Sequence, residues 1–266
     1  FNTLGNGQLI DDVWTLRWVE GSWRLWMPVD DGLQRYTTTM AADASGAPMM
    51  EPSGMGTELA LGNAPDDVEE FADAHYAPAL GRMLFASEGD LWTARTGEYL
   101  GDWSFDTASI LQSEPDSWRA HLGGPSIALG VEATHLFFDA AEGDAGSEEY
   151  SVIGTATTTD GLNYTVDDAP ILEPQHPHEG THIADPYVVY DSDTELWRMF
   201  YSAFDGDKWT IGHAVSQDLS AWTADELPLI TASEGGAAAP SVHRQLGRWH
   251  MWFSAWDGAA WSLAYA

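Results

Sequence analysis

One short phrase recurs five times along the chain, at intervals of 52–63 residues. Each copy begins with polar or aromatic residues, continues as a short apolar run that contains aromatic side chains, and is often followed by an acidic turn. The copies lie at residues 23–26, 81–85, 134–138, 197–201 and 249–253. Together they account for the whole length of 266 residues. A spacing of this kind is the signature of a repeat architecture, so the sequence predicts five similar units.

The fourth repeat shows the internal pattern of one unit most clearly. Runs rich in β-branched and aromatic residues lie at 185–190, 197–202 and 209–216, and an apolar stretch at 228–230 ends the unit. Turns rich in Asp and Gly separate these runs, which is typical of a four-stranded antiparallel sheet. Helical periodicity is absent. The sequence therefore predicts an all-β protein, a five-bladed β-propeller of four-stranded antiparallel blades.

The last repeat ends after its third strand, and the missing outer strand has a counterpart at the other end of the chain. Residues 1–10 match the outer-strand pattern, and pairing them beside residues 261–266 would close the ring and cover an exposed edge. We expect one domain over residues 1–266. Its predicted blades lie at about 11–61, 62–116, 117–174, 175–233, and 234–266 together with 1–10.

The charge balance restricts the partners of this chain. It has 42 acidic and 10 basic residues, a net charge of −32. Nucleic acids and anionic lipid surfaces require clustered Lys and Arg, so both are excluded, and anionic polysaccharides are disfavoured. We interpret the acidic surface as adaptation to concentrated salt or as a solubility feature, with direct cation binding as the alternative. The sequence has no Cys and no apolar run long enough to span a membrane.

Candidate catalytic residues follow from the predicted channel. The innermost strand of each blade lines the central channel, so the first residues of these strands converge at one mouth. Aligning the repeats places Asp12, Glu70 and Asp185 at equivalent positions, with Gly124 and Ala239 at the other two. Two carboxyl groups that flank a glycosidic bond can hydrolyse it, and crowding raises the pKa of one so that it serves as the acid. Alternatively, these carboxylates bind water or a structural cation, or cap turns.

Further candidates surround this mouth. Trp14 and Tyr187 each lie two residues past a channel carboxylate, hence on the same strand face, and are candidate sugar-stacking residues. The alternative for both is packing against a neighbouring blade. Glu179 and His182 lie in a His-rich loop, residues 175–182, that should overhang the mouth. They are candidates for contacting sugar or transferring protons, and the alternative is a plain loop without a functional role. The spacing of the loop fits no standard zinc pattern.

Three features of the sequence resemble a known group of proteins. They are the Asp-Pro start at 185–186, the strand Trp-Arg-Met-Phe-Tyr-Ser at 197–202 and the turn Ser-Gln-Asp-Leu-Ser-Ala-Trp at 216–222. They look like the corresponding segments of the five-bladed glycoside hydrolases. This superfamily includes the arabinanases and β-xylosidases of family 43 and the fructan- and sucrose-cleaving enzymes. The resemblance covers the architecture of the whole chain.

The resemblance implies a catalytic set on three successive blades: an Asp base or nucleophile, an Asp that tunes proton affinity, and a Glu acid. Asp185 matches the first Asp, but the next blade offers Ala239, and the one after it offers Asp12 where the Glu is expected. Starting instead at Asp12 gives Glu70 and then Gly124. Neither alignment reproduces the complete set.

We therefore expect a glycoside hydrolase-like propeller that acts on arabinose-, xylose- or fructose-type linkages of a neutral oligosaccharide or polysaccharide. Asp185 and Asp12 would perform the chemistry, tuned by Glu70 or Glu179. The first alternative is a non-catalytic carbohydrate-binding propeller with the same mouth, and the second is a structural interaction domain. We expect a monomer, secreted or at the cell surface, that requires no cofactor. The resemblance also suggests a hydrated calcium ion in the channel near His213. The alternative is that His213 is a core residue with its hydrogen bonds satisfied.

Overall fold

The structure, a computed structural model, describes residues 15–19, 22–29, 32–42, 48–52, 59–69, 71–96, 103–142, 150–231, 235–245 and 247–266. Within these residues the regular elements are strands, apart from one 3-10 turn, η1 (Leu61–Asn63). The all-β prediction is therefore confirmed. The described residues contain no helix that is long and apolar enough to cross a membrane.

The strands follow one another as antiparallel groups, each named here by its first strand. Single parallel pairings, Ser151 with His182 and Trp209 with Gly236, join the last three groups into one hydrogen-bonded sheet. The β1 unit contains β1 (Thr15–Val19), β2 (Ser22–Val29), β3 (Gly32–Ala42), β4 (Pro48–Pro52) and β5 (Leu59–Ala60). The β6 unit contains β6 (Ala72–Ala77), β7 (Arg82–Ser87), β8 (Asp90–Thr96) and β9 (Trp103–Phe105). The β10 unit contains β10 (His121–Leu129), β11 (Thr134–Ala141), β12 (Ser151–Thr158) and β13 (Thr165–Val166). The β14 unit contains β14 (His182–Asp191), β15 (Leu196–Phe204), β16 (Trp209–Ser216), β17 (Thr223–Ala224) and β18 (Ile230–Thr231). The β19 unit contains β19 (Gly236–Gln245), β20 (Arg248–Trp256) and β21 (Trp261–Tyr265).

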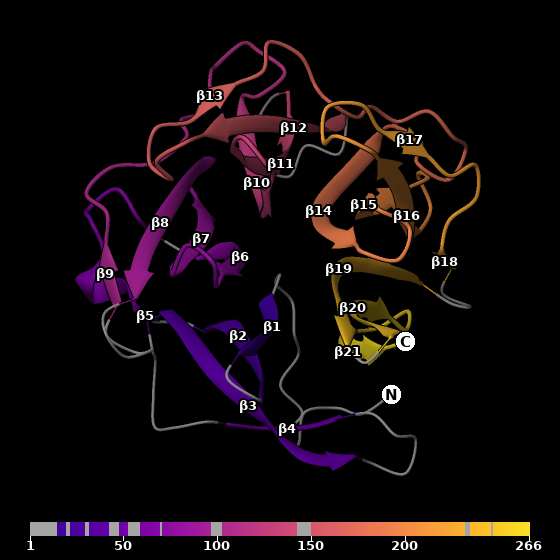
Figure 1. Cartoon of the computed structure of the whole chain (residues 1–266), viewed down its shortest axis with the longest axis horizontal. Coiled ribbons are helices and arrows are strands. Elements are labelled where there is room, and N and C mark those ends of the chain that lie inside the picture. The colour runs from indigo at the N-terminus through magenta and orange to yellow at the C-terminus, as the bar shows by residue number, and fades with distance from the viewer. Residues whose placement is uncertain are drawn as a thin grey trace.

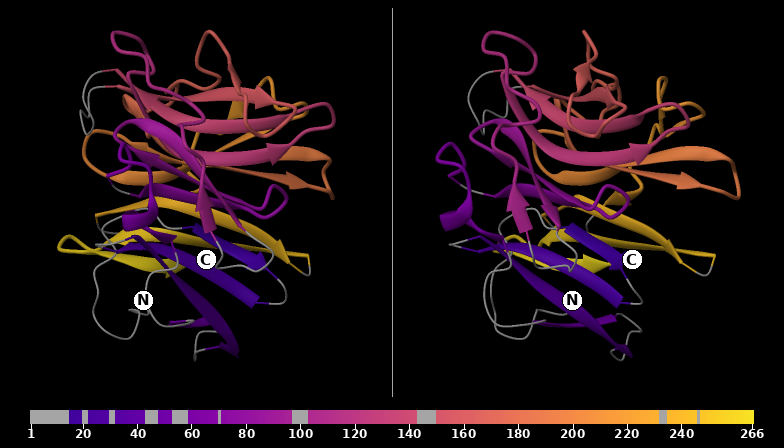
Figure 2. Two further views of the ribbon diagram at one scale, coloured as in Figure 1. Left: turned by 90° about the vertical axis from the view of Figure 1, so that its left-hand side faces the viewer. Right: turned by 60° about the vertical axis from the view of Figure 1, so that its left-hand side comes forward.

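These units are arranged around a central axis, with the first strand of each nearest to it (Figure 1). Strand β6 lies beside β10, β10 beside β14, and β14 beside β19, while β1 has contacts with both β6 and β19. In side view the long strands run roughly along the axis, from one face of the molecule to the other (Figure 2). Each inner strand therefore has one end at a face of the molecule.

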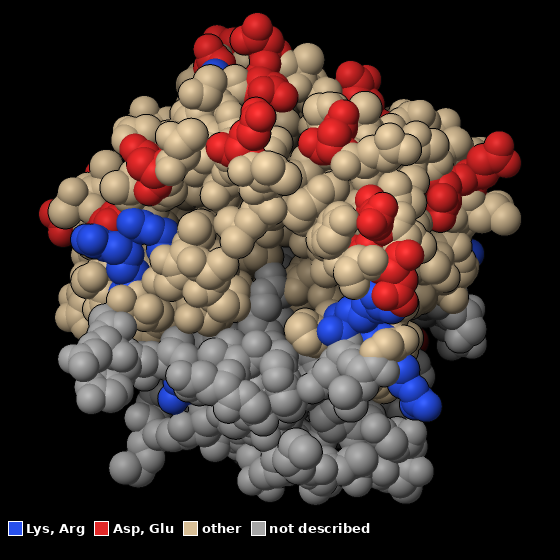
Figure 3. Space-filling model, in the orientation of Figure 1, with Lys and Arg blue, Asp and Glu red and all other residues tan. Residues whose placement is uncertain are grey.

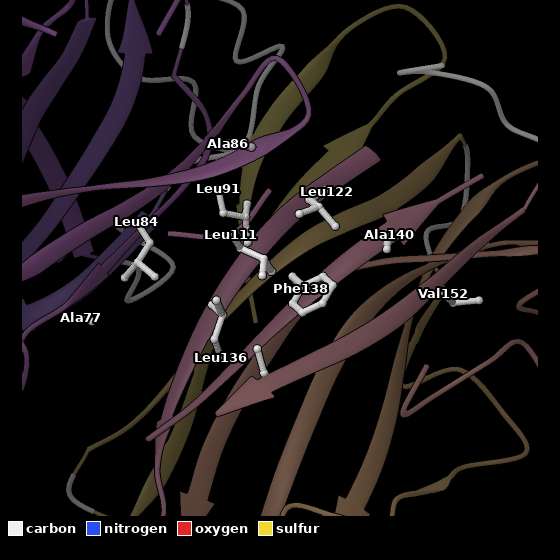
Figure 4. Close-up of a cluster of buried hydrophobic side chains, with 11 residues drawn as sticks. Ala77, Leu84, Ala86, Leu91, Leu111, Leu122, Leu136, Phe138, Ala140 and Val152 are labelled. Carbon is white, nitrogen blue, oxygen red and sulfur yellow. The ribbon is translucent and has the colours of Figure 1, made fainter. Parts of the chain in front are cut away.

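Apolar side chains fill the space between neighbouring units. One cluster joins Leu84 and Leu91 of the β6 unit to Leu122, Leu136 and Phe138 of the β10 unit (Figure 4). Similar clusters lie between the β1 and β6 units, the β10 and β14 units, and the β14 and β19 units. Burial of this apolar area is the main stabilising contribution, and it fixes each sheet against the next.

Strand β15 shows why the recurring phrase is apolar without alternation. Successive side chains of a strand point to opposite faces. Met199 and Tyr201 pack towards the β10 unit, whereas Phe200 packs towards the β19 unit. A middle strand that is covered on both faces needs apolar residues at successive positions, which Met199, Phe200 and Tyr201 provide.

Charged side chains are distributed unevenly over the surface. On the face shown in Figure 3, Asp and Glu are spread widely, while Lys and Arg form a few small groups. One ion-pair group lies on the β14 and β19 units, where Asp191 accepts hydrogen bonds from Arg198 at 2.9 Å and from Arg244 at 3.1 Å. Both guanidinium groups also lie over the ring of Trp249, at 5.8 and 5.6 Å from its centroid. Two of the few cations thus join neighbouring units: Arg244 through Asp191, and Arg198 through the ring of Trp249.

Residues 1–10, which the sequence predicts to complete the last blade, lie outside the described residues. Closure of the ring by this segment stays a prediction, as do the blade number and the domain boundaries. We expect deletion of residues 1–10 to lower the melting temperature strongly and to cause aggregation, because the edge of β21 would lose its partner. Differential scanning calorimetry and light scattering would measure both effects.

A synthetic peptide of residues 1–10, added to the shortened chain, serves as the control and should restore part of the lost stability. If the shortened chain instead melts within about 2 °C of the intact one, a shift that corresponds to a small free-energy change, the closure prediction is wrong.

Candidate functional site

The same backbone irregularity occurs near the start of four inner strands. The pairing register shifts between Ala72 and His75 in β6 and at the corresponding points of β10, β14 and β19. The residue inside each shift has a positive φ: 51° at Asp73, 48° at Gly124, 50° at Asp185 and 52° at Ala239. Such β-bulges re-aim side chains and are common beside active sites. These four residues line one hollow on the axis, which we call the mouth.

Three carboxyl groups from successive units meet beside this mouth. Asp73 and Asp185 line it directly. Asp139, on β11, lies between them: its Oδ1 accepts the Asp185 backbone N–H at 2.9 Å, while Oδ2 of Asp73 accepts the Gly124 N–H at 3.2 Å. A Cβ built on Gly123 would lie 2.7 Å from an Asp139 oxygen and 2.8 Å from an Asp73 oxygen. Asp73 and Asp139 therefore approach the same small volume.

Glycine at position 124 makes room for Asp139. A Cβ added to Gly124 would overlap Oδ1 of Asp139 and would lie 3.0 Å from the Cα of Asp185. The carboxyl group of Asp139 thus occupies the space into which a side chain at 124 would project. The inner strand of the β10 unit lacks a carboxylate at its bulge, and the neighbouring strand of the same unit supplies one.

The cluster favours retention of a proton. Burial, followed by the negative charges of Asp185 and Asp73, raises the pKa of Asp139 well above its ordinary value. Burial also raises the pKa of Asp185, but hydrogen bonds from the Ser202 hydroxyl and the Ala239 backbone oppose that rise. The Ser202 hydroxyl donates to Oδ2 of Asp185 at 2.6 Å. Asp139 is therefore the preferred position of the proton, and Asp185 is the carboxyl group better stabilised as an anion.

The mouth is narrow at this level. Its volume is about 30 Å³, close to the space of one water molecule. His75 and Tyr187 stand two residues past the bulges of their strands and line the same hollow, with ring centroids 5.8 Å apart. Tyr187 is 8% exposed and also packs in the apolar cluster between the β14 and β19 units. Tyr187 therefore lines the mouth and also packs between units, while its predicted sugar-stacking role stays a prediction.

Some of the predicted site residues cannot be placed. Asp12, Trp14 and Glu70 lie outside the described residues. The alignment that paired Glu70 with Asp185 is corrected by the strand register, which assigns the equivalent position to Asp73. The reason is the short turn between β6 and β7, which shifts any alignment that is counted back from the recurring phrase.

Glu179 and His182 lie away from the residues that line the mouth. Glu179 is fully buried, and its carboxylate accepts the backbone N–H groups of Gln175 and His176, at 2.5 and 2.7 Å, and the Tyr201 hydroxyl at 2.5 Å. It thereby holds the loop 175–182 in place. The ring of His182 stands edge-on to Trp209, at 5.2 Å between centroids. The structure therefore gives Glu179 a loop-fixing position and His182 a packing position.

His213 is engaged on β16 rather than at the mouth. Its Nδ1 lies 2.8 Å from Oδ2 of Asp225, and its Nε2 lies 3.3 Å from the Arg198 guanidinium. The carboxylate can only accept, so Nδ1 donates to it and the lone pair of Nε2 faces the Arg198 guanidinium rather than the mouth. Within the described part of the chain, no three His, Asp or Glu side chains are arranged so that they could hold a metal ion.

Sequence reasoning missed Asp73 and Asp139. A signal for Asp73 was present, because Asp73-Ala74-His75 has the same Asp-x-aromatic pattern as 185–187. Asp139 comes directly after the recurring phrase of its unit, at the position that Ser202 occupies in the β14 unit, and the two side chains perform the same task. Asp139 accepts the bulge N–H of Asp185, and Ser202 accepts that of Ala239 at 2.7 Å.

Comparison with known proteins identifies the fold. No protein-family model and no curated protein sequence matches this chain. A solved thermostable family-43 glycoside hydrolase superposes with a TM-score of 0.76 at 12% identity, covering 99% of this chain and 92% of that one. The endo-arabinase from Bacteroides thetaiotaomicron VPI-5482 gives 0.70 at 16% identity, with 99% and 95% coverage. The α-L-arabinofuranosidase from Lactobacillus brevis gives 0.69 at 11% identity, with 99% and 92% coverage.

Identities this low show the fold alone. The chain has the fold of the β-propeller glycoside hydrolases, which confirms the resemblance that its sequence motifs indicate.

The role of Gly124 can be tested with a matched pair of substitutions. We expect Gly124→Ala to cost about 1–3 kcal/mol more stability than Gly161→Ala, because it adds an overlap with Asp139. Both glycines have positive φ, 48° and 73°, but a Cβ at Gly161 meets nothing within 4 Å. Urea denaturation of both variants measures the difference, and adding Asp139→Ala to Gly124→Ala should recover part of it. Equal losses in the two variants would show that Asp139 does not fill this space.

Proposed function

We propose that this protein is a glycoside hydrolase that acts on a neutral glycan at the mouth of its channel. The observation that carries the proposal is the convergence of Asp73, Asp139 and Asp185, with one of the three favoured as the protonated form. Glycoside hydrolysis requires one carboxyl group as acid and another as base or nucleophile, held by a rigid scaffold. No cofactor is needed, because carboxyl groups perform both proton transfers.

Asp185 is the proposed base. Hydrogen bonds from Ser202 and the Ala239 backbone favour its anionic form, and it borders a hollow of about one water molecule. In the proposed reaction a water in that hollow gives a proton to Asp185 while its oxygen attacks the anomeric carbon. A second carboxyl group protonates the departing glycosidic oxygen.

Two residues compete for the role of the acid. Asp73 lines the mouth, and Asp12 is the residue that the sequence alignment favours. Asp139 lies against Gly124 and is not among the residues that line the mouth; it is the proposed tuning group, whose retained proton limits the negative charge around Asp185. Asp139 would thus take the part of the proton-tuning carboxylate, for which the alignment that starts at Asp185 offers only Ala239.

The class of substrate rests on charge and on the structural neighbours. A net charge of −32 disfavours anionic polysaccharides, which leaves neutral ones. The neighbours include proteins described as an endo-arabinase and an α-L-arabinofuranosidase, so arabinose-type linkages are the first choice, followed by xylose- and fructose-type linkages. A polymeric substrate would place the protein outside the cell, secreted or at the surface. We further propose a monomeric, five-bladed ring closed by residues 1–10.

A non-catalytic carbohydrate-binding propeller is the second candidate. Ala239 supports it, because this bulge position lines the mouth and carries no carboxylate. In that case the same mouth would bind a sugar hydroxyl or water without turnover.

Asparagine substitutions separate the two candidates. If the protein is an enzyme, Asp185→Asn should lower kcat on arabino-, xylo- or fructo-oligosaccharides by about 10²–10⁴-fold, because a positioned base is lost. Asp73→Asn and Asp12→Asn should show which residue is the acid, as only the acid variant should recover activity on a substrate with a good leaving group. Asp207→Asn, at an exposed turn, is the control and should retain full activity.

Reducing-sugar release and calorimetric titration with the same oligosaccharides are the measurements. Full activity of Asp185→Asn would contradict the proposed mechanism. Binding without any turnover by the intact protein would contradict the enzyme proposal and favour the binding propeller.

A further inference from the structure

Ser202 joins the bulges of two neighbouring units. It lies on β15, directly after the recurring phrase of its unit, and it is fully buried. Its hydroxyl oxygen accepts the backbone N–H of Ala239, the bulge residue of β19, at 2.7 Å. The same hydroxyl donates to Oδ2 of Asp185, the bulge residue of β14, at 2.6 Å. Ser202 therefore connects a candidate catalytic carboxylate to the backbone of the next unit.

The two contacts together decide where the hydroxyl hydrogen of Ser202 points. A serine hydroxyl has one hydrogen, and a backbone N–H can only donate, so this hydrogen is not directed at Ala239. It is available to Asp185, whose ionised carboxylate can only accept. A distance of 2.6 Å is typical of a hydroxyl that donates to an ionised carboxylate, a bond about twice as strong as one between neutral groups. The geometry therefore favours the ionised form of Asp185 and fixes the direction of its carboxylate.

In the β10 unit, Asp139 takes the place that Ser202 has in the β14 unit. Each of the two follows the recurring phrase of its unit and accepts the N–H of the next bulge, at 2.9 Å for Asp139 and 2.7 Å for Ser202. They differ in what else they bring to the site, because a carboxyl group adds an acidic group and a serine adds a donor. Asp185 thus contacts a carboxyl group through its backbone N–H and a hydroxyl donor through its side chain.

The surroundings of Asp185 act on its ionisation in opposite directions. Burial raises its pKa, and the hydrogen bond from Ser202 opposes that rise more than the bond from the Ala239 backbone does. Neither Ser202 on β15 nor Ala239 on β19 carries a charge. The titratable groups at or beside the mouth, in the part of the chain that the structure describes, come from β6, β11 and β14: Asp73, His75, Asp139, Asp185 and Tyr187.

We propose that Ser202 is the positioning residue of Asp185, which orients its carboxylate and keeps it ready to accept a proton. The effect on the carboxylate follows from the two hydrogen bonds, whereas its consequence for hydrolysis rests on the proposed function. Because the N–H of Ala239 holds the serine in place, the β19 unit contributes to the site through its backbone. The lack of an acidic side chain at position 239 therefore does not exclude this unit from the chemistry.

Ser202→Ala removes the donor, and carbon-13 NMR of the Asp185 carboxyl group measures the result without any substrate. Its resonance is identified by its loss in Asp185→Asn. We expect the titration midpoint to rise in Ser202→Ala, because the ionised form loses a hydrogen bond that the neutral form needs less. On an oligosaccharide that the protein hydrolyses, kcat on the acidic side of the pH profile should fall by about tenfold, with KM little changed. Ser202→Thr keeps a hydroxyl and should restore the midpoint in part.

Ser126→Ala is the matched control. Ser126 is also fully buried, and its hydroxyl accepts a backbone N–H of the next unit, that of Val188, at 3.1 Å. Its loss should lower the stability in urea and leave the Asp185 midpoint unchanged. An unchanged midpoint in Ser202→Ala, or an equal rise in Ser126→Ala, would overturn the proposal. A raised midpoint in a protein that turns over no sugar would support the role of Ser202 and contradict only the proposed hydrolase.

A second variant keeps the test decisive if Ser202→Ala fails to fold. Ser202→Cys has nearly the same shape, but a thiol is a weak donor and a weak acceptor. The Asp185 midpoint should rise in this variant as well, by less than in Ser202→Ala where both can be measured. A folded Ser202→Cys whose Asp185 titrates as in the intact protein would overturn the proposal.

Discussion

A positive-φ residue at the bulge of four inner strands, β6, β10, β14 and β19, is the constraint on which the site depends. The bulge interrupts the pairing near one end of the strand and turns the intervening residue towards the axis. Left-handed backbone costs about 1–2 kcal/mol for a residue other than glycine, and Asp73, Asp185 and Ala239 all adopt it. The apolar clusters between the units supply the stability that holds these strained residues in place. Because the bulge repeats from unit to unit, these residues line the same mouth.

The carboxylates of the protein act on stability in two opposite ways. Burial and neighbouring charges raise the pKa of Asp139, so its stabilising contribution is complete below the unfolded pKa of about 4 and is lost as pH rises through the folded value. Asp160 and Asp218 cap turns, and hydrogen bonds to the turn backbone lower the pKa of each. Their contribution is present above the unfolded pKa and is lost as pH falls through the folded one. The carboxyl cluster at the mouth therefore costs stability at neutral pH that the turn carboxylates help to offset.

The all-β architecture could be predicted from the sequence because each unit repeats both its apolar phrase and its turn residues. The position of Asp185 at the mouth could also be predicted, since the Asp-Pro start of its strand resembles those of known hydrolases. Asp73 was missed because the turn between β6 and β7 is short. Counting back from the recurring phrase therefore gives a different residue from the one at the bulge. Asp139 was hidden for a different reason. It belongs to a second strand, and it can approach the mouth only because Gly124 has no side chain. The pattern of residues along one strand does not reveal such a relation between two strands. The buried position of Glu179 likewise depends on Tyr201, 22 residues later.

The central claim is that Asp73, Asp139 and Asp185 share one site in which Asp139 keeps a proton. Carbon-13 NMR of the aspartate side-chain carboxyl groups, followed through a pH titration of the intact protein and of Asp139→Asn, tests it most directly. The account predicts one carboxyl resonance that titrates well above the ordinary aspartate value of about 4 and that disappears in Asp139→Asn. If Asp139→Asn instead removes a resonance that titrates at or below the ordinary value, Asp139 is ionised like a surface aspartate and the account is contradicted.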